Sequence, residues 1–285
     1  MPLFRRPDGV LVPDLSPLRR VIPYLMRTRN ESVVYFEQVL DVTRTLDWIR
    51  RWNEAHAGNG APKLTLFHVV LAGCGRALLA RPGLNRFVSG GRIYQRRGVQ
   101  ISFAAKKAFD DDAPLVTVKL DLHEGEHLDA VARRAHEAVH DARDGDARPV
   151  DREVGLIMRL PGPLVHALVA AARLLDRFNL LPWALMRDDP MYASLFLANL
   201  GSVGIDRVWH HLYEYGTVSV FGALGTIERR LEPATDGGAP RVRHRVRLRF
   251  TYDERINDGF YCAASLEQMR AYVEDPESVE GPPVR

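Results

Sequence analysis

The sequence lacks any uncharged apolar run as long as the ~18 to 20 residues that a membrane-spanning helix needs. Its first 14 residues contain Arg5 and Arg6 but no apolar segment of the kind that a secretory signal carries. Only two cysteines, Cys74 and Cys262, occur in 285 residues, which excludes a disulfide framework and a CxxC metal site. These absences predict a protein of a reducing, cytoplasmic setting.

The sequence also contains few lysines and carries a small net charge. Arginine outnumbers lysine 35 to 4, and 39 basic against 36 acidic side chains leave a formal net charge of +3. So small a charge creates no general attraction for polyanions, and we expect no nucleic-acid partner. The hydrophobic content of 46% excludes a disordered chain, and the length suffices to bury an adequate core.

What the sequence does contain is an alternation of strand and helix patterns without internal repeats or Gly/Ser linkers. Strands are predicted over 32–40, 99–105, 114–122, 192–200, 217–231 and 241–250, with a hairpin over 86–96. Helical periodicity predicts helices over 43–56, 63–80 and 128–143. This order indicates an α/β domain.

The least polar segment, Leu156–Met186, contains a further predicted helix after Pro163. At helical spacing, Leu164, Leu168 and Leu175 lie on one side of it. Burial in the core or in a contact between subunits is the favoured explanation, because broad apolar faces are usually covered. A membrane surface or a bound acyl chain is the alternative, which the thin polar stripe on the other side disfavours.

Five arginines alternate strictly along Arg241–Arg249 and therefore share one strand face. A solvated face paired with carboxylates such as Glu228 and Glu232 is the favoured interpretation. A binding face for phosphates or for an acidic protein partner is the alternative.

The segment Asp253–Gly259 (DERINDG) closes a strand and opens the last helix. It resembles the Asp-His-Arg-x-x-Asp-Gly signature in the catalytic core of 2-oxoacid dehydrogenase dihydrolipoyl acyltransferases, which shares its fold with chloramphenicol acetyltransferase. Two more segments, Pro82–Asn85 (PGLN) and Ser194–Gly204 (SLFLANLGSVG), are similar to family segments in the same order. The resemblance extends over residues 17–275. It implies a chloramphenicol-acetyltransferase-like α/β fold, a two-layer mixed sheet with flanking helices, that forms trimers with active sites between subunits.

Two chemical groups of the family motif are replaced. The family's histidine, the general base that takes the thiol proton, falls at Glu254, and its oxyanion-binding serine falls at Ala198. An ordinary carboxylate, with a pKa of about 4.3, is a poor base towards a thiol with a pKa of about 8.5. Loss of one oxyanion donor typically costs about 3 to 4 kcal/mol of transition-state stabilisation. Asp258 and Asn199 match the family, and the resemblance implies that Asp258 orients the loop, so the pattern predicts an altered or lost activity.

Two functional hypotheses follow from the resemblance. The first is acyl transfer that depends on coenzyme A and a thiol, with Glu254 in place of the histidine and Asn199 or a backbone amide at the oxyanion. The second is a catalytically inactive trimeric scaffold or an acyl- or coenzyme-A-binding relative.

A third hypothesis, a zinc hydrolase, rests on the HExxH match from His136 to His140, with Glu137 as the base. No third ligand can be assigned, and the neighbouring Arg133 and Arg134 disfavour a dication. No metal is therefore expected.

The resemblance also implies a homotrimer and divides the chain into an arm (1–16), the acyltransferase-like catalytic domain (17–275) and a polar tail (276–285). No lipoyl domain fits into the arm, and the tail lacks the hydrophobic anchor of cage-forming relatives, so we expect a stand-alone protein without a larger cage. His210 and His211 are interpreted as paired surface histidines and Cys262 as a packed helix residue, rather than as catalytic groups.

Overall fold

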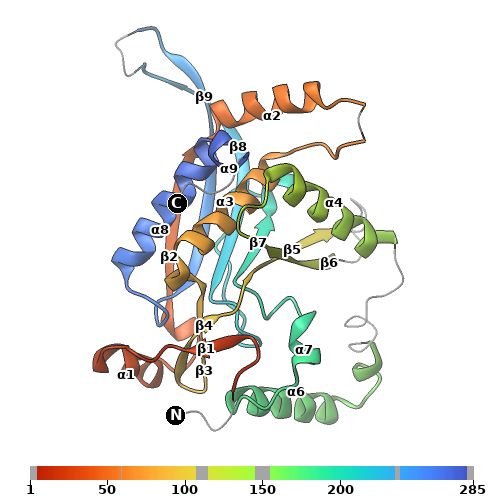
Figure 1. Ribbon diagram of the computed structural model, residues 1–285, viewed down its shortest axis with the longest axis vertical. Coiled ribbons are helices and arrows are strands. Elements are labelled where there is room, and N and C mark those ends of the chain that lie inside the picture. The colour runs from red at the N-terminus through yellow and green to blue at the C-terminus, as the bar shows by residue number, and fades with distance from the viewer. Residues whose placement is uncertain (1–4, 59, 107–114, 145–154, 235–237, 281–285) are drawn as a thin grey trace.

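The computed structural model describes residues 5–58, 60–106, 115–144, 155–234 and 238–280. Within them the chain forms a six-stranded mixed sheet in the order β2-β9-β8-β7-β5-β6 and a three-stranded sheet in the order β1-β4-β3 (Figure 1). The strands are β1 (Gly9–Leu11), β2 (Val33–Asp41), β3 (Arg86–Ser89), β4 (Arg92–Arg96), β5 (Val99–Lys106), β6 (Leu115–Leu122), β7 (Leu195–Asn199), β8 (Val220–Glu232) and β9 (Arg241–Asp253). This mixed α/β architecture confirms the predicted fold class, and each predicted strand is present.

Four helices pack against one face of the large sheet: α2 (Thr43–Ala55), α3 (Leu66–Ala80), α4 (Leu128–Asp144) and α8 (Gly259–Glu274). Eleven of the 15 residues of α3 are buried, because this helix lies between the sheet, α4 and α8. Fully buried Leu71, Ile101 and Leu248 belong to this core. The core thereby fixes α8 and the end of β9 that leads into it.

The opposite face of the large sheet is covered by an irregular segment, residues 205–216. Phe196 and Phe221, from neighbouring strands, stack with ring centroids 5.1 Å apart and pack against Leu212 of this segment. Trp209 lies against Tyr35 of β2, with ring centroids 5.4 Å apart. Candidate site residues lie on this face and at the end of β9.

α6 (Gly162–Arg177) and the short α7 (Trp183–Arg187) lie at the end of the molecule that also carries α1 (Pro17–Leu25) (Figure 1). No residue of α6 is buried within the chain, so burial in the core is wrong for this helix, and its burial in a contact between subunits stays a prediction. Polar contacts hold the helix at its C-terminal end. Arg6 Nη2 lies 2.8 Å from Asp176 Oδ1, and Ser89 Oγ donates to the backbone oxygen of Asp176 at 3.2 Å.

Among the described residues, no helix is both long and apolar enough to cross a bilayer. Arginines of β9 pair with carboxylates, as the favoured interpretation of that face predicts, but Arg249 is buried rather than solvated. Arg245 Nε donates to Glu232 at 2.9 Å, and Arg247 binds Glu228. No unpaired arginine face towards a partner follows from these contacts.

Candidate functional site

The motif turn between β9 and α8 is held together by a buried ion pair. The Asp253 carboxylate accepts hydrogen bonds of 2.8 Å from both Nε and Nη2 of Arg255, and one of 3.0 Å from Ser32 Oγ. The side chains of Asp253 and Arg255 are 0% and 4% exposed. The remaining Nη1 of Arg255 donates to the backbone oxygen of Met26 at 3.1 Å. The outer residues of the Asp-x-Arg motif are therefore structural, because they fix the turn that carries Glu254.

Glu254 is exposed on this rigid turn. Its backbone N–H donates to the oxygen of Ser32 at 3.0 Å, and Arg19 Nη1 donates to its backbone oxygen at 3.4 Å. Its carboxylate has no hydrogen bond or ion pair with another residue that the structure describes. Within one chain Glu254 is thus held in place by its backbone and lacks an enclosing apolar pocket.

Asp258 begins α8. Its Oδ1 accepts a 2.8 Å hydrogen bond from the backbone N–H of Tyr261, which is the usual N-cap contact. The side chain thereby stabilises the helix that follows the motif. The part in catalysis that the resemblance implies for Asp258, orienting the loop, remains a prediction.

Ala198 and Asn199 lie at the end of β7, far from Glu254 in the same chain. Ala198 pairs with Ala223 of β8, which pairs with Arg249 of β9, five residues before Glu254. Five residues of strand span roughly 16 Å and two strand spacings roughly 10 Å. One chain therefore does not bring the positions of the family's histidine and serine together.

His210 is half-buried on the sheet face that also carries Ala198. Its ring stacks on Phe221 with centroids 3.8 Å apart, and its backbone oxygen accepts a hydrogen bond from Thr251 Oγ1. Its Nδ1 lies 2.7 Å from the backbone oxygen of His211, so Nδ1 carries the hydrogen and Nε2 is left as an acceptor in the neutral ring. Burial lowers the pKa of His210, which favours that neutral form. The prediction of a surface pair holds for exposed His211 but not for His210.

The comparisons with known proteins agree with this architecture. The profile described as 2-oxoacid dehydrogenases acyltransferase (catalytic domain) matches residues 11–157, just over half of the chain. The chain belongs to this acyltransferase family. No curated protein matches the sequence.

Solved structures share the fold of this acyltransferase-family chain at low sequence identity. A probable dihydrolipoamide acetyltransferase from Listeria monocytogenes 4b F2365 is 18% identical with a TM-score of 0.63, covering 93% of this chain and 95% of that one. Dihydrolipoamide acetyltransferase from Azotobacter vinelandii is 18% identical with a TM-score of 0.59, covering 94% of each chain. A chloramphenicol acetyltransferase is 12% identical with a TM-score of 0.54, covering 93% and 99%. These likenesses confirm the predicted fold.

The HExxH segment of this acyltransferase-family chain lies on α4. His136 is close enough to His68 of α3 to contribute, after burial, to lowering the pKa of His68 to about 4. Among the residues whose placement is described, no group of three or more His, Cys, Asp or Glu side chains could hold a metal ion. The zinc-hydrolase hypothesis with His136, Glu137 and His140 therefore finds no support.

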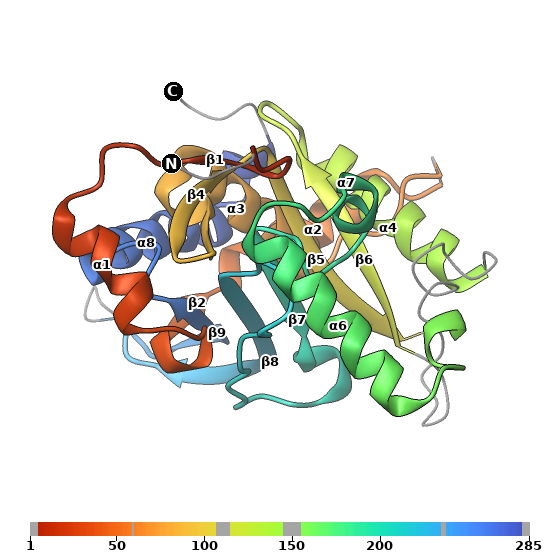
Figure 2. The same ribbon diagram turned by 90° about the horizontal axis from the view of Figure 1, so that it is seen from below.

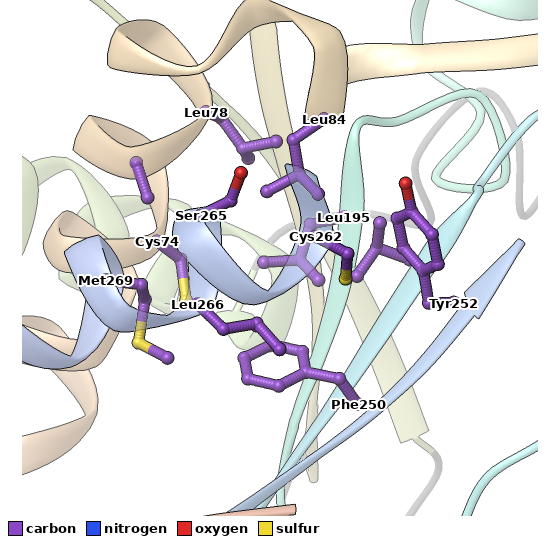
Figure 3. A pocket seen from close by; sticks show the side chains of 12 residues that line it. Cys74, Leu78, Leu84, Leu195, Phe250, Tyr252, Cys262, Ser265, Leu266 and Met269 are labelled. Carbon is purple, nitrogen blue, oxygen red and sulfur yellow. The ribbon is translucent and has the colours of Figure 1, made fainter. Parts of the chain in front are cut away.

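The cysteines lie in the core. Figure 3 shows Cys74 of α3 and Cys262 of α8 beside Phe250 and Tyr252 of β9. These side chains line a small apolar cavity of about 20 Å³. Such a cavity holds about one water molecule and no substrate. Burial raises the pKa of both thiols to about 12, so the expected structural role of Cys262 fits its surroundings.

A groove of about 1130 Å³ opens between α1 and α6, next to the motif turn. Tyr24 of α1 and Arg27, which follows that helix, line one wall, His166 and Arg173 of α6 line the other, and Arg255 of the motif also borders it. No local sequence pattern indicates this groove, because its walls come from segments about 140 residues apart. The lining combines apolar and cationic side chains and also includes Asp176 and Glu214.

Sequence reasoning also missed Arg29. Its Nη1 donates to the backbone oxygens of Tyr213 at 3.1 Å and Glu214 at 3.0 Å, residues 184 and 185 positions away. Arg29 thereby ties the segment that follows His210 to the chain next to the motif. Burial lowers the pKa of this guanidinium. No local pattern marks such a residue, since its partners are backbone oxygens from another part of the chain.

Proposed function

We propose that this chain transfers an acyl group from coenzyme A to an acceptor thiol, as a homotrimer whose sites form between copies. The observation that carries this proposal is the exposed Glu254 on a turn locked by Asp253 and Arg255, roughly 19 Å from Ala198 in the same chain when strand spacings are combined. A site that uses both family positions must draw them from two copies. The turn presents Glu254 outward, where a second copy can meet it.

In this site Glu254 of one copy accepts the proton of the acceptor thiol. The neighbouring copy encloses the Glu254 carboxylate. Desolvation at such a contact raises the pKa of a carboxyl group towards that of the thiol, which makes proton transfer effective. The thiolate attacks the thioester carbonyl, and the Asn199 amide of the other copy donates to the oxyanion in place of the missing serine. Collapse of the intermediate expels the coenzyme A thiolate, which takes the proton back from Glu254.

His210 is the competing proton acceptor. Its Nε2 is free to accept a proton, and its ring lies on the same sheet face as Ala198. An acyl-transfer assay separates Glu254 from His210, because either side chain can be replaced by glutamine with little change in size.

The experiment is acyl transfer from a panel of acyl-coenzyme A thioesters to dihydrolipoamide, with acylated product detected by mass spectrometry. We expect Glu254→Gln to lower turnover about 10²- to 10⁴-fold, the usual effect of losing a general base. Glu124→Gln, at an exposed carboxylate without a partner among the described residues, is the matched control and should keep full turnover. Loss of turnover in His210→Gln alone would transfer the role to His210.

A second candidate function, a catalytically inactive scaffold or acyl-coenzyme A binder, is favoured by two observations. Ala198 has no donor, and the Glu254 carboxylate is exposed and unpaired in the chain. Absence of turnover in the wild-type chain, with calorimetric binding of coenzyme A retained, would replace the first proposal by this one.

A further inference from the structure

α6 forms one wall of the groove but packs only weakly on the rest of the chain. Figure 2 shows this end of the molecule from below, with α6 across its middle and α1 to the left. Val165, Val169 and Arg173 of α6 line the groove. No residue from 155 to 178 is buried, and the first buried residue after the helix is Asn179. Segments that bury so few side chains open locally at a low free energy, so a small number of polar contacts decides where α6 lies.

The guanidinium group of Arg6 binds the C-terminal end of α6. Its Nη2 lies 2.8 Å from Asp176 Oδ1, and its Nη1 donates to the backbone oxygen of Asp176 at 3.1 Å. Nη1 also donates to Ser89 Oγ of β3 at 3.0 Å. Arg6 is only 3% exposed, and hydrogen bonds between charged groups are stronger in such surroundings than in water. We call these contacts between Arg6, Ser89 and Asp176 the Arg6 latch.

Arg6 is fixed to the body of the protein independently of α6. Its Nε lies 2.6 Å from Asp8 Oδ1, and the Asp8 carboxylate also lies 3.8 Å from Arg96 Nη1. The guanidinium groups of Arg6 and Arg96 lie 4.8 and 4.5 Å from the ring centroid of buried Phe87. Arg6 therefore keeps a carboxylate partner when α6 moves away. Opening of the latch avoids the large cost of leaving a buried charge unpaired.

Asn179, directly after α6, has the properties of a joint. Its φ of 61° is left-handed, and no other non-glycine residue that the structure describes has a positive φ. Residues in such sparsely populated conformations cluster at clamps and switch regions. The Asn179 side chain is held by the body, since its Nδ2 donates to Tyr94 Oη at 3.0 Å. Beyond the joint, α7 is fixed by Lys119, whose Nζ donates to the backbone oxygen of Arg187 at 2.9 Å.

We propose that α6 is a movable wall of the groove, which the Arg6 latch holds closed and which opens about Asn179. Opening breaks the contacts of Asp176 with Arg6 and Ser89 and transfers the Asp176 carboxylate to water. Because Arg255 of the motif turn borders the same groove, the position of α6 controls access to the surface beside the candidate site. The proposal concerns the fold of one chain and holds whichever reaction the site performs.

Hydrogen exchange of the full chain, measured by mass spectrometry, tests the latch. In the wild type the amides of α6 are expected to exchange faster than those of α3, in which 11 of 15 residues are buried. Arg6→Met should accelerate exchange in α6 roughly 10- to 100-fold, the effect of losing hydrogen bonds to a charged group. Asp176→Ala leaves the pair of Arg6 and Asp8 intact and should accelerate exchange in α6 while α3 exchanges as in the wild type. Arg44→Met, at an exposed arginine 2.8 Å from Glu277, is the matched control and should change neither helix.

Three results overturn the proposal. Amides of α6 that exchange as slowly as those of α3 in the wild type would show that another surface, such as a second copy, covers this helix. Equal acceleration of α3 and α6 in Asp176→Ala would show that the contact stabilises the whole fold rather than one wall. Unchanged exchange of α6 in both Asp176→Ala and Arg6→Met would show that these contacts do not hold the helix. Acceleration confined to α6 supports the latch.

Discussion

The buried pair of Asp253 and Arg255 offers the sharpest test of how the motif turn is built. Replacing Asp253 with alanine removes two 2.8 Å hydrogen bonds to the guanidinium group and the acceptor for Ser32 Oγ. Arg255 would remain 4% exposed, with the backbone oxygen of Met26 as its remaining acceptor among these contacts. Leaving such a charge buried without its partner costs about 3 to 5 kcal/mol. We expect Asp253→Ala to lower the free energy of unfolding by that amount.

Equilibrium unfolding in urea measures this loss. Asp47→Ala is the control, since Asp47 lies 3.6 Å from Arg50 in an exposed pair, and such pairs contribute up to about 1 kcal/mol. Asp253→Leu combined with Arg255→Met should recover most of the loss, because the double variant leaves neither member of the pair buried without its partner. A loss below about 1 kcal/mol in Asp253→Ala, equal to that of the control, would refute the reasoning.

Three shorter predictions follow. Gly201→Ala should lower the free energy of unfolding by about 1 to 3 kcal/mol, because its Cβ would overlap the backbone oxygen of Gly225; an unchanged thermal midpoint would show that this close approach is absent. Hydrogen bonds from Arg247 hold the pKa of Glu228 at about 2. The ionised Glu228 therefore stabilises the folded state above about pH 4.5, and this stabilisation is lost as the pH falls towards 2. Glu228→Gln should flatten that part of the pH–stability curve, and an identical curve would contradict the ion pair. The thiol of Cys262, with a pKa raised to about 12 by burial, should resist a thiol reagent in the native protein and react in denaturant, whereas rapid native labelling would place it at the surface.

The sequence predicted the sheet well because strand patterns report which side chains are buried. β9 alternates arginines with apolar residues, and its arginines meet carboxylates on neighbouring segments as the alternation predicts. The order of the family-like segments along the chain also predicted the fold, because each segment occupies a fixed place in it.

The same periodicity did not indicate what covers the apolar side of α6. A helix with apolar residues on one side is buried only if something covers that side, and the covering surface is not encoded in the helix itself. α6 is held through Asp176 by Arg6 at the far N-terminal end of the chain, which no local pattern of α6 indicates.

The candidate site was predictable only in part. The sequence identified Glu254 and Ala198 as replacements, because each falls at a fixed place in a short motif. It could not separate His210 from His211, since the difference arises from stacking on Phe221 and from a hydrogen bond between neighbouring residues. Long-range packing of this kind is decided by the whole fold.

Because Glu254 and Ala198 lie far apart in one chain, the central claim is that the protein assembles into a trimer. Sedimentation equilibrium across a dilution series measures the mass of the assembly against the 32.1 kDa chain. We predict a mass of three chains that persists at the concentrations used for acyl transfer. A mass of one chain at those concentrations would contradict the account, because the two family positions would then have no means of sharing a site.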